Sequence, residues 1–128
     1  MVQAMFFKPP QDLTSQVFAR LPDELRTGKP DNEWVRGQPG APLTSLLEGP
    51  SFDGDGNLWC VDVVNGRILR VDAGGTFHVA AEYDGWPNGL KIHKDGRIFL
   101  ADYKNGIMEM DPANGRVRPW LVRAGLER

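Results

Sequence analysis

The chain repeats part of its own sequence, and this repeat constrains the fold more than any other feature. When residues 46–85 are shifted by 40 positions, seven identities fall into line, most of them glycine or asparagine. Apolar positions follow the same offset, as Phe52 with Ile92 shows. A fixed period of this length is typical of an architecture in which one supersecondary unit recurs. The identical pairs are Gly49/Gly89, Asp55/Asp95, Gly56/Gly96, Asp62/Asp102, Asn65/Asn105, Gly66/Gly106 and Gly75/Gly115.

Each repeat divides into four short segments at turn sequences. Asp-Gly, Asn-Gly and Gly-Gly pairs separate the segments, and such pairs favour the positive φ angles of tight hairpins. A unit of four short strands and about 40 residues is the signature of a β-propeller blade. We therefore predict an all-β fold in which residues 46–85 form blade 1 and residues 86–122 form blade 2. The alternative is a small antiparallel sandwich whose two hairpin pairs are similar only because they share turn chemistry.

The first 45 residues differ from the repeats. They contain six of the ten prolines, so we expect residues 1–45 to form an N-terminal arm that packs on a core, and not a domain. Residues 14–21 are a candidate strand that would close the ring of blades. Pro22 followed by Asp23 favours one helical turn, and residues 27–45 are expected to be extended.

Two blades are too few for a closed propeller, which needs about 4–8. Two isolated blades would also expose large apolar faces. We expect residues 123–128 to lead towards a missing blade 3, and the remaining blades to be absent from this chain or supplied by a separate one. A ring of three copies is the alternative, and it would place three Glu48 carboxylates on one axis.

Composition excludes several classes of partner and site. The net charge is -2 and the basic residues form no run, so neither nucleic acid nor an anionic membrane is an expected partner. No apolar stretch approaches the roughly 20 residues of a membrane span. The residues before Pro9 lack the apolar core of a secretory signal, so a cytoplasmic location is expected. Cys60 is the only cysteine, and a buried, inert thiol is the expected state for it.

Glu48 and Asn88 are the candidate site residues. They lie 40 positions apart, and each precedes the first strand of its repeat. The first strands of propeller blades line the central channel, so these side chains would converge there. Carboxylate and amide oxygens are hard donors of the kind that Ca²⁺ and Mg²⁺ prefer. The sequence thus suggests a cation at Glu48; alternatively, Glu48 accepts backbone hydrogen bonds at a strand start or faces solvent.

Residues 53–64 resemble a calcium-binding loop only in part. It begins like an EF-hand loop, but Leu58 and Val64 stand where such a loop needs glycine and glutamate. We interpret the segment as a turn followed by a strand.

The remaining polar candidates are interpreted as structural. His78 and His93 stand alone in the sequence and are expected to be surface or strand residues. Asp62 and Asp102 recur at the ends of equivalent strands, which favours a turn-stabilising role over a catalytic one.

Two stretches of the repeats resemble the SMP-30/gluconolactonase/regucalcin-like family. They are LEGPSFDGDGNLWCVDVVNGRILRVD and PNGLKIHKDGRIFLADYKNGIMEMDP, and the resemblance covers residues 46–122 well and the arm loosely. It implies a six-bladed β-propeller with one divalent cation in its channel, most often Ca²⁺, with Mg²⁺, Mn²⁺ or Zn²⁺ as alternatives. It also implies a hydrolase, a lactonase that opens a small-molecule lactone by metal-assisted attack of water.

The resemblance also assigns roles to the two candidate residues. Glu48 matches the glutamate of the family's EGP motif, which is a metal ligand, and Asn88 is implied as a substrate-binding residue. The other ligands of that family lie in later blades, so the 128 residues alone are expected to be inactive and the general base is unassigned. The second hypothesis is a non-catalytic propeller that binds or scaffolds. Metal-dependent lactone hydrolysis by the complete protein would separate the two.

Overall fold

The computed structural model describes residue 7 and residues 9–26, 33–40 and 43–122. Eight strands dominate these residues, and they form two four-stranded antiparallel sheets in the orders β1-β2-β3-β4 and β5-β6-β7-β8. We refer to them as sheet A and sheet B. The strands are β1 (Leu47–Phe52), β2 (Leu58–Asp62), β3 (Arg67–Val71), β4 (Phe77–Glu82), β5 (Pro87–Ile92), β6 (Ile98–Asp102), β7 (Gly106–Asp111) and β8 (Arg116–Leu121).

The all-β prediction is confirmed. Each sheet is a meander in which consecutive strands pair, as expected from strands joined by short turns. Sheet A therefore spans Leu47–Glu82 and sheet B spans Pro87–Leu121. Two consecutive four-stranded antiparallel sheets of this kind are consistent with two blades of a β-propeller.

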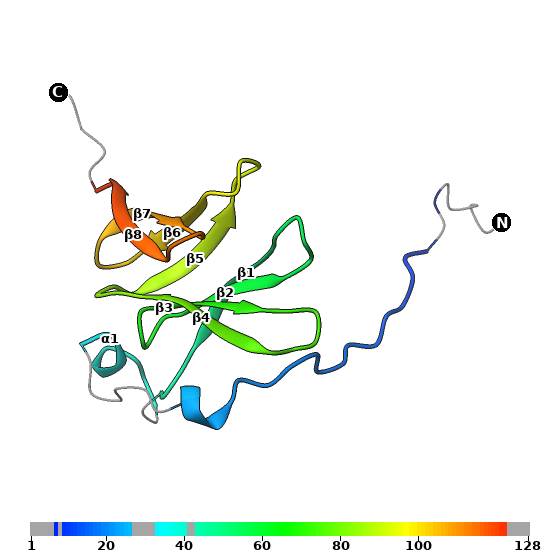
Figure 1. Cartoon of the computed structure of the whole chain (residues 1–128). Coiled ribbons are helices and arrows are strands. Elements are labelled where there is room, and N and C mark those ends of the chain that lie inside the picture. The colour runs from blue at the N-terminus through cyan, green and yellow to red at the C-terminus, as the bar shows by residue number, and fades with distance from the viewer. Residues whose placement is uncertain (1–6, 8, 27–32, 41–42, 123–128) are drawn as a thin grey trace.

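The main hydrophobic core lies between the two sheets. Sheet A contributes Trp59, Val61 and Ile68, and the facing side of sheet B contributes a row of aliphatic and methionine side chains. That row is Leu90, Ile98, Leu100, Met108 and Met110. In Figure 1 the first strand of each sheet, β1 and β5, lie next to each other where the sheets meet. The sheets are thus held together by apolar burial, as neighbouring repeats usually are.

A second, smaller core lies on the other face of sheet A. Cys60 and Leu69 project to this face, and Leu21 of the arm packs against them. Two partly buried side chains, Leu25 and Phe77, complete this cluster. The arm thus covers the side of sheet A that faces away from sheet B.

The arm departs from its expected structure in two places. Residues 14–21 have no regular secondary structure, and no described strand pairs with them. The ring-closing strand stays a prediction, because an extended segment needs a neighbouring edge to become part of a ladder, and the last blade that would supply it lies outside the described residues. Residues 27–45 include a four-residue helix, α1 (Glu33–Arg36), where only extended chain was expected. The helical turn after Pro22 is confirmed as η1 (Asp23–Leu25).

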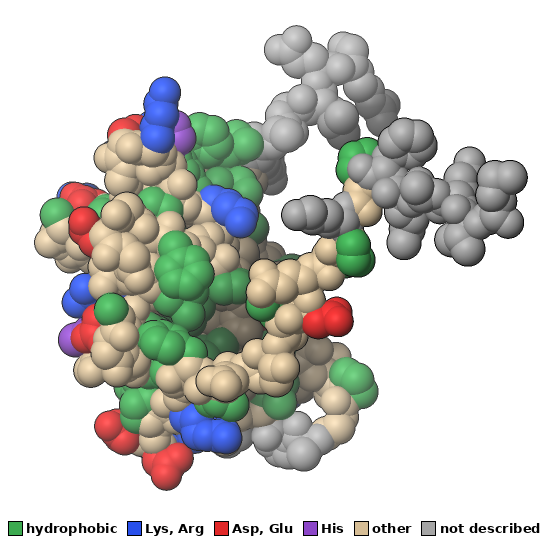
Figure 2. Space-filling view, turned by 90° about the vertical axis from the view of Figure 1, so that its right-hand side faces the viewer, with side chains coloured by type: hydrophobic (Ala, Val, Ile, Leu, Met, Phe, Trp, Pro, Cys, Tyr) green, Lys and Arg blue, Asp and Glu red, His purple; other side chains and the backbone are tan. Residues whose placement is uncertain are grey.

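Figure 2 shows hydrophobic side chains gathered in and around a hollow on the face that it views, with part of the arm running beside it. No helix in the described part of the chain is long and apolar enough to span a membrane.

Candidate functional site

Glu48 lies in β1, the first strand of sheet A, where its Cα is opposite that of Val61 in β2. Its side chain is half-buried. Among the described residues it makes no hydrogen bond or ion pair. The alternative in which Glu48 accepts backbone hydrogen bonds therefore finds no support, and its carboxylate oxygens remain free to bind another group.

The backbone around Glu48 is irregular. The pairing of β1 with β2 shifts between Glu48 and Ser51, which marks a β-bulge. Bulges bend a strand and re-aim a side chain, and they are frequent next to functional sites. The bulge contains Gly49, whose φ of +61° is one that side-chain-bearing residues rarely adopt.

The first strands of the two sheets touch closely at this bulge. A Cβ on Gly49 would lie 2.5 Å from the backbone nitrogen of Leu90 and 3.0 Å from the Cα of Gly89. Two residues on, the Ser51 hydroxyl donates a hydrogen bond of 3.0 Å to the Leu90 carbonyl oxygen. The glycines directly following Glu48 and Asn88 therefore meet across the sheet boundary.

Asn88 occupies the corresponding place in β5. It is half-buried, and the pairing of β5 with β6 also shifts beside it, between Pro87 and Gly89. Asn88 lines a pocket of about 210 Å³ together with Ala101 and Ile107. The structure therefore places both candidate residues at bulges inside adjacent first strands, and not just before them as the sequence suggested.

The donor chemistry of these two residues suits a hard cation, but two side chains do not complete a site. Ca²⁺ takes about 6–8 oxygen ligands. In the part of the chain that the structure describes, no three His, Cys, Asp or Glu residues are grouped so that they could hold a metal ion. Glu48 could supply one carboxylate and Asn88 one amide oxygen.

Asp62 and Asp102 are turn-stabilising residues, as predicted. Asp62 is fully buried, and its Oδ2 accepts hydrogen bonds from Arg67 at 2.9 Å and from Asn65 at 2.8 Å. Its Oδ1 accepts a bond from the backbone N–H of Leu46, which fixes the chain just before β1. This buried network holds the entry to the strand that carries Glu48.

Asp102 fixes the second repeat in a similar way and also joins the two sheets. Its Oδ1 accepts bonds from the backbone N–H groups of Lys104 and Asn105. Its Oδ2 accepts a 2.6 Å bond from the hydroxyl of Tyr83, which follows β4. Burial, and then the Asp102 carboxylate, raise the pKa of Tyr83 well above its ordinary value. Tyr83 therefore stays neutral and acts as a donor.

The segment that begins like a calcium loop is a turn closed by Asp53. Its Oδ2 accepts hydrogen bonds from the indole Nε1 of Trp59 at 2.7 Å and from the Asn57 amide at 2.9 Å. Burial raises the pKa of Asp53, but these bonds and those from the backbone of Asn57 and Asp55 outweigh it and lower the pKa to about 2. Both oxygens of the Asp53 carboxylate are therefore used in hydrogen bonds that close the turn.

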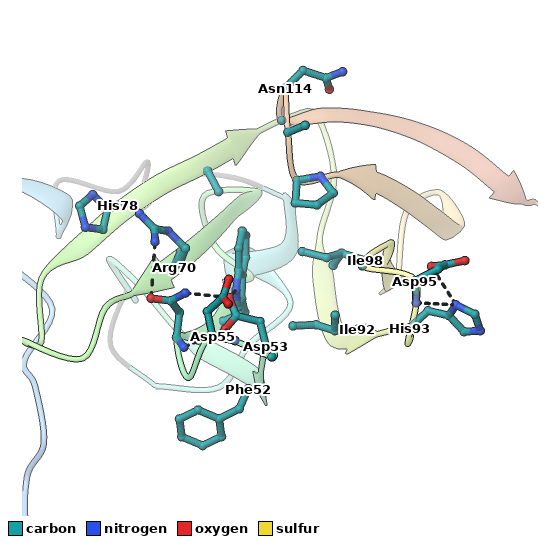
Figure 3. A pocket seen from close by; sticks show the side chains of 18 of the residues that line it. Phe52, Asp53, Asp55, Arg70, His78, Ile92, His93, Asp95, Ile98 and Asn114 are labelled. Atoms are coloured by element: carbon teal, nitrogen blue, oxygen red, sulfur yellow. Dashed lines mark hydrogen bonds and ion pairs between the residues drawn. The ribbon is translucent and has the colours of Figure 1, made fainter.

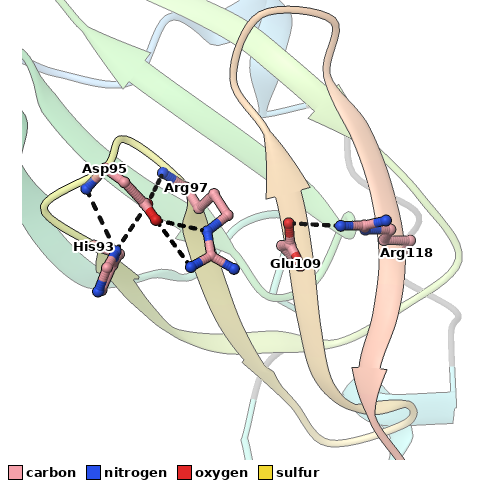
Figure 4. Close-up of polar contacts among 5 residues, drawn as sticks. All are labelled: His93, Asp95, Arg97, Glu109 and Arg118. Carbon is pink, nitrogen blue, oxygen red and sulfur yellow. Dashed lines mark hydrogen bonds and ion pairs between the residues drawn. The ribbon is translucent and has the colours of Figure 1, made fainter.

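Each histidine is paired with a nearby aspartate. His78 in β4 lies 3.0 Å from Asp72, and the contact lowers the pKa of that aspartate. His93 lies 2.8 Å from Asp95, whose other oxygen contacts Arg97 at 2.9 Å (Figure 4). Arg97 first, and then His93, lower the pKa of Asp95 strongly. Both histidines are strand or surface residues, as expected.

Cys60 is buried in β2, and burial first, with the Asp62 charge adding to it, raises its pKa to about 11. Its thiol is protonated at neutral pH, which agrees with the inert role expected from the sequence.

A cavity of about 1160 Å³ lies at the other end of the first strands, away from Glu48. It is lined by the turn residues that follow β1, β5 and β7 and by parts of the facing strands. In Figure 3, Ile92 and Ile98 project towards the side where Asp53 and Arg70 lie, whereas Phe52 projects away. This cavity is a groove between the sheets and does not contain the candidate site residues.

Sequence reasoning missed the side-chain bonds that close the turns. Asp53 bonds to residues four and six positions later, and Asp72 bonds to Thr76 and His78 at the same two spacings. An aspartate followed by a polar residue at position four and a ring donor at position six was the signal that could have revealed them.

Comparison with known proteins shows partial homology to lactonases. The chain is 40% identical over 73 residues to "Lactonase drp35" of Staphylococcus haemolyticus, a match that covers 51% of this chain and 22% of that protein. The enzyme of the same name from Staphylococcus epidermidis is 38% identical over 64 residues, covering 45% of this chain and 19% of the relative. That of Staphylococcus aureus is 38% identical over 65 residues, with 46% and 20% covered.

These matches confirm the resemblance as partial homology to drp35 lactonases, which are members of the SMP-30/gluconolactonase family. The chain spans about a fifth of the length of these curated relatives. No protein-family model matches the chain.

Proposed function

We propose that this chain supplies two blades of a divalent-metal-dependent lactonase, a hydrolase that opens a lactone ring by attack of water. The observation that supports it most is the 40% identity over 73 residues to a lactonase. The half-buried carboxylate of Glu48, which lacks a partner among the described residues, is the second support. A carboxylate is costly to desolvate unless something compensates its charge, and a cation does this.

In this proposal Glu48 holds a divalent cation at the start of the first strand, and its hard carboxylate oxygens favour Ca²⁺. When bound, such a cation polarises a lactone carbonyl and stabilises the charge that develops on its oxygen. The bulge sets the direction of the Glu48 side chain, and the close contact of Gly49 with Gly89 and Leu90 brings the first strand of sheet B beside it. Asn88, on the neighbouring first strand, would hydrogen-bond the substrate through its amide.

The proposal extends beyond the described residues. It includes a small-molecule lactone substrate, a six-bladed ring completed by blades outside these two sheets, and a cytoplasmic location. The general base is not assigned, because the described residues include no group of three or more His, Cys, Asp or Glu side chains from which one could be chosen.

A chimera tests the proposal. The segment of the S. haemolyticus lactonase that matches this chain is replaced by the matching residues of this chain, and lactone hydrolysis and Ca²⁺ affinity are measured. We expect the chimera to hydrolyse lactones and a chelator to abolish this activity. Glu48→Gln should lower the Ca²⁺ affinity by about 10–100-fold or more, because loss of a residue that merely hydrogen-bonds to a metal ligand already has an effect of that size. The 128-residue chain assayed alone should be inactive.

Glu82→Gln is the matched control, since Glu82 is exposed at the end of β4 and loses the same charge. It should leave activity and Ca²⁺ affinity unchanged. A folded chimera that neither binds Ca²⁺ nor hydrolyses lactones would favour the non-catalytic propeller instead.

A further inference from the structure

The groove of about 1160 Å³ between sheets A and B contains an arginine that no described acid neutralises. Arg70, in β3, lines this groove and is half-buried. Among the described residues its guanidinium forms no ion pair, and its Nη1 donates one long hydrogen bond, of 3.5 Å, to the side-chain oxygen of Asn57. A guanidinium has five N–H donors. Most of the donors of Arg70 are therefore available to a further group.

The carboxylates that line the groove do not pair with Arg70. Both oxygens of Asp53 accept the bonds that close its own turn, and the Asp95 carboxylate has ion pairs of its own. Figure 3 shows Asp95 beyond Ile92, on the side away from Arg70. Asp55 is exposed in its turn, where water screens its charge. Arg70 thus lies in the groove without a carboxylate in contact with it.

The second repeat shows how the equivalent position is satisfied within the chain. Arg70 is directly opposite His78 in β4. His78 and Arg118 are 40 positions apart, so the equivalent pair in sheet B is Glu109 and Arg118, which are also directly opposite each other. Glu109 is buried and contacts Arg118 at 3.0 Å, a stabilising cross-strand pair of opposite charge. In sheet A the acid is missing from this pair: Asp72 contacts His78 at 3.0 Å, and Arg70 is left over.

The walls beside Arg70 are apolar. Trp59, directly opposite Arg70 in β2, is buried and belongs to the main core. Ile92 and Ile98 project from sheet B on the other side of the groove (Figure 3). Sites for small organic molecules are typically lined by apolar side chains with a few well-placed polar groups. This combination favours a ligand with an anionic head and an apolar body.

The charge and shape of Arg70 favour a carboxylate as the anionic head. The planar guanidinium can donate two parallel hydrogen bonds to a carboxylate. Lys94 also lines the groove but is exposed in the turn after β5. One half-buried guanidinium balances a singly charged anion, whereas a phosphate dianion would need more positive charge.

We propose that this groove binds a small organic carboxylate, with the carboxylate on Arg70 and the apolar body between Trp59 and the two isoleucines, Ile92 and Ile98. The site lies at the other end of the first strands from Glu48 and uses none of the residues of the proposed lactonase site. Both of its walls come from sheets A and B. The inference goes beyond the proposed function and does not rest on it.

Hexanoate is the probe, and it is titrated into the 128-residue chain with a chelator present, so that no metal ion can hold it. We expect the methyl NMR signals of Ile92 and Ile98 to shift. Those of Ile107, which lines the separate pocket at Asn88, should stay in place. Acetate should bind at least about 10-fold more weakly, because it lacks the CH₂ groups that the walls would bury. Hexanamide, which has no charge, should also bind at least about 10-fold more weakly.

Two variants test the role assigned to Arg70. Arg70→Gln removes the charge and the paired donors, and it should weaken hexanoate binding at least about 10-fold. Ile92→Glu leaves Arg70 in place but supplies a carboxylate across the groove, and it should weaken binding to a similar degree, so the test holds even where one variant disturbs folding. Arg116→Gln is the matched control, because Arg116 is exposed in β8 and does not line the groove. It should leave the affinity unchanged.

Equal hexanoate affinity of Arg70→Gln and the unchanged chain would overturn the proposal. Shifts at Ile107 without shifts at Ile92 would place the binding at the Asn88 pocket and would overturn it as well. Acetate that binds as tightly as hexanoate would indicate a general anion site, which is also a contrary result. None of these readouts involves a metal or a lactone, so the proposed function and this inference can fail separately.

Discussion

At the scale of single residues, aspartate carboxylates stabilise the turns by accepting hydrogen bonds. Asp53, Asp72 and Asp102 each accept bonds from backbone N–H groups and from a side chain. Buried Asp62 pairs with Arg67. Glu48 differs from all of them, since no described residue donates to its carboxylate. This contrast singles out Glu48 more clearly than its position in the sequence does.

The Asp53 turn should make stability depend on pH in the acid range. The folded pKa of Asp53 is about 2, below the value of about 3.9 in an unfolded chain. Its contribution is therefore fully present above about pH 4 and is lost as the pH falls through 2. Asp53→Ala should lower the free energy of unfolding at pH 7 by about 1–3 kcal/mol, because it leaves the Trp59 indole N–H without its acceptor.

Urea unfolding at pH 7 and at pH 2 measures this effect, and the deficit of Asp53→Ala should shrink at the lower pH. Asp55→Ala is the control, since the Asp55 side chain is exposed and its loss should change stability by no more than about 0.5 kcal/mol. A deficit that is the same at both pH values would contradict the assigned role.

At the scale of elements, the arm acts as a cover for one face of sheet A and is not a strand. Its contribution rests on Leu21, which is 8% exposed, whereas Leu13 and Val17 of the same arm are 82% and 66% exposed. A segment held by so few apolar contacts is expected to open locally before the sheets unfold.

The reactivity of Cys60 reports this opening. Leu21→Asp should place a charge against Cys60 and Leu69, release the arm, and raise the labelling rate of Cys60 by about 10-fold or more at a pH where the sheets stay folded. Leu13→Asp, which changes an exposed residue, should leave the rate unchanged. Equal rates in the two variants would show that the arm does not protect the thiol.

At the scale of the whole molecule, we expect sheets A and B to unfold as one cooperative unit. They share a core to which both contribute buried side chains, and they are joined by the Ser51–Leu90 and Tyr83–Asp102 hydrogen bonds. Repeat units that cannot bury their faces alone gain stability from such interfaces.

Leu100→Ala should therefore destabilise both sheets together. Leu100 is fully buried at the interface, and its truncation should cost about 2–5 kcal/mol. Hydrogen exchange should accelerate in β2 and β3 as much as in β6 and β7, and unfolding should remain a single transition. Lys94→Ala, in an exposed turn, is the control. Exchange that accelerates only in sheet B would mean that the two sheets unfold independently.

The sequence by itself determined the four strands of each repeat, their order, and the equivalence of Glu48 and Asn88. It could do so because turn chemistry and the 40-residue period are local, and each hairpin depends on residues close to it in the chain. The same locality explains why Asp62 and Asp102 were correctly interpreted as turn residues.

Only the tertiary structure decided what depends on distant neighbours. The sequence could not show that no described strand pairs with residues 14–21, that Leu21 covers Cys60, or that no described element covers one face of sheet B. It also could not show that Glu48 has no donor among the described residues while the aspartates do. Strand pairing, burial and the hydrogen bonds to a carboxylate depend on contacts between residues that are far apart in the sequence. Local propensity carries no information about such contacts.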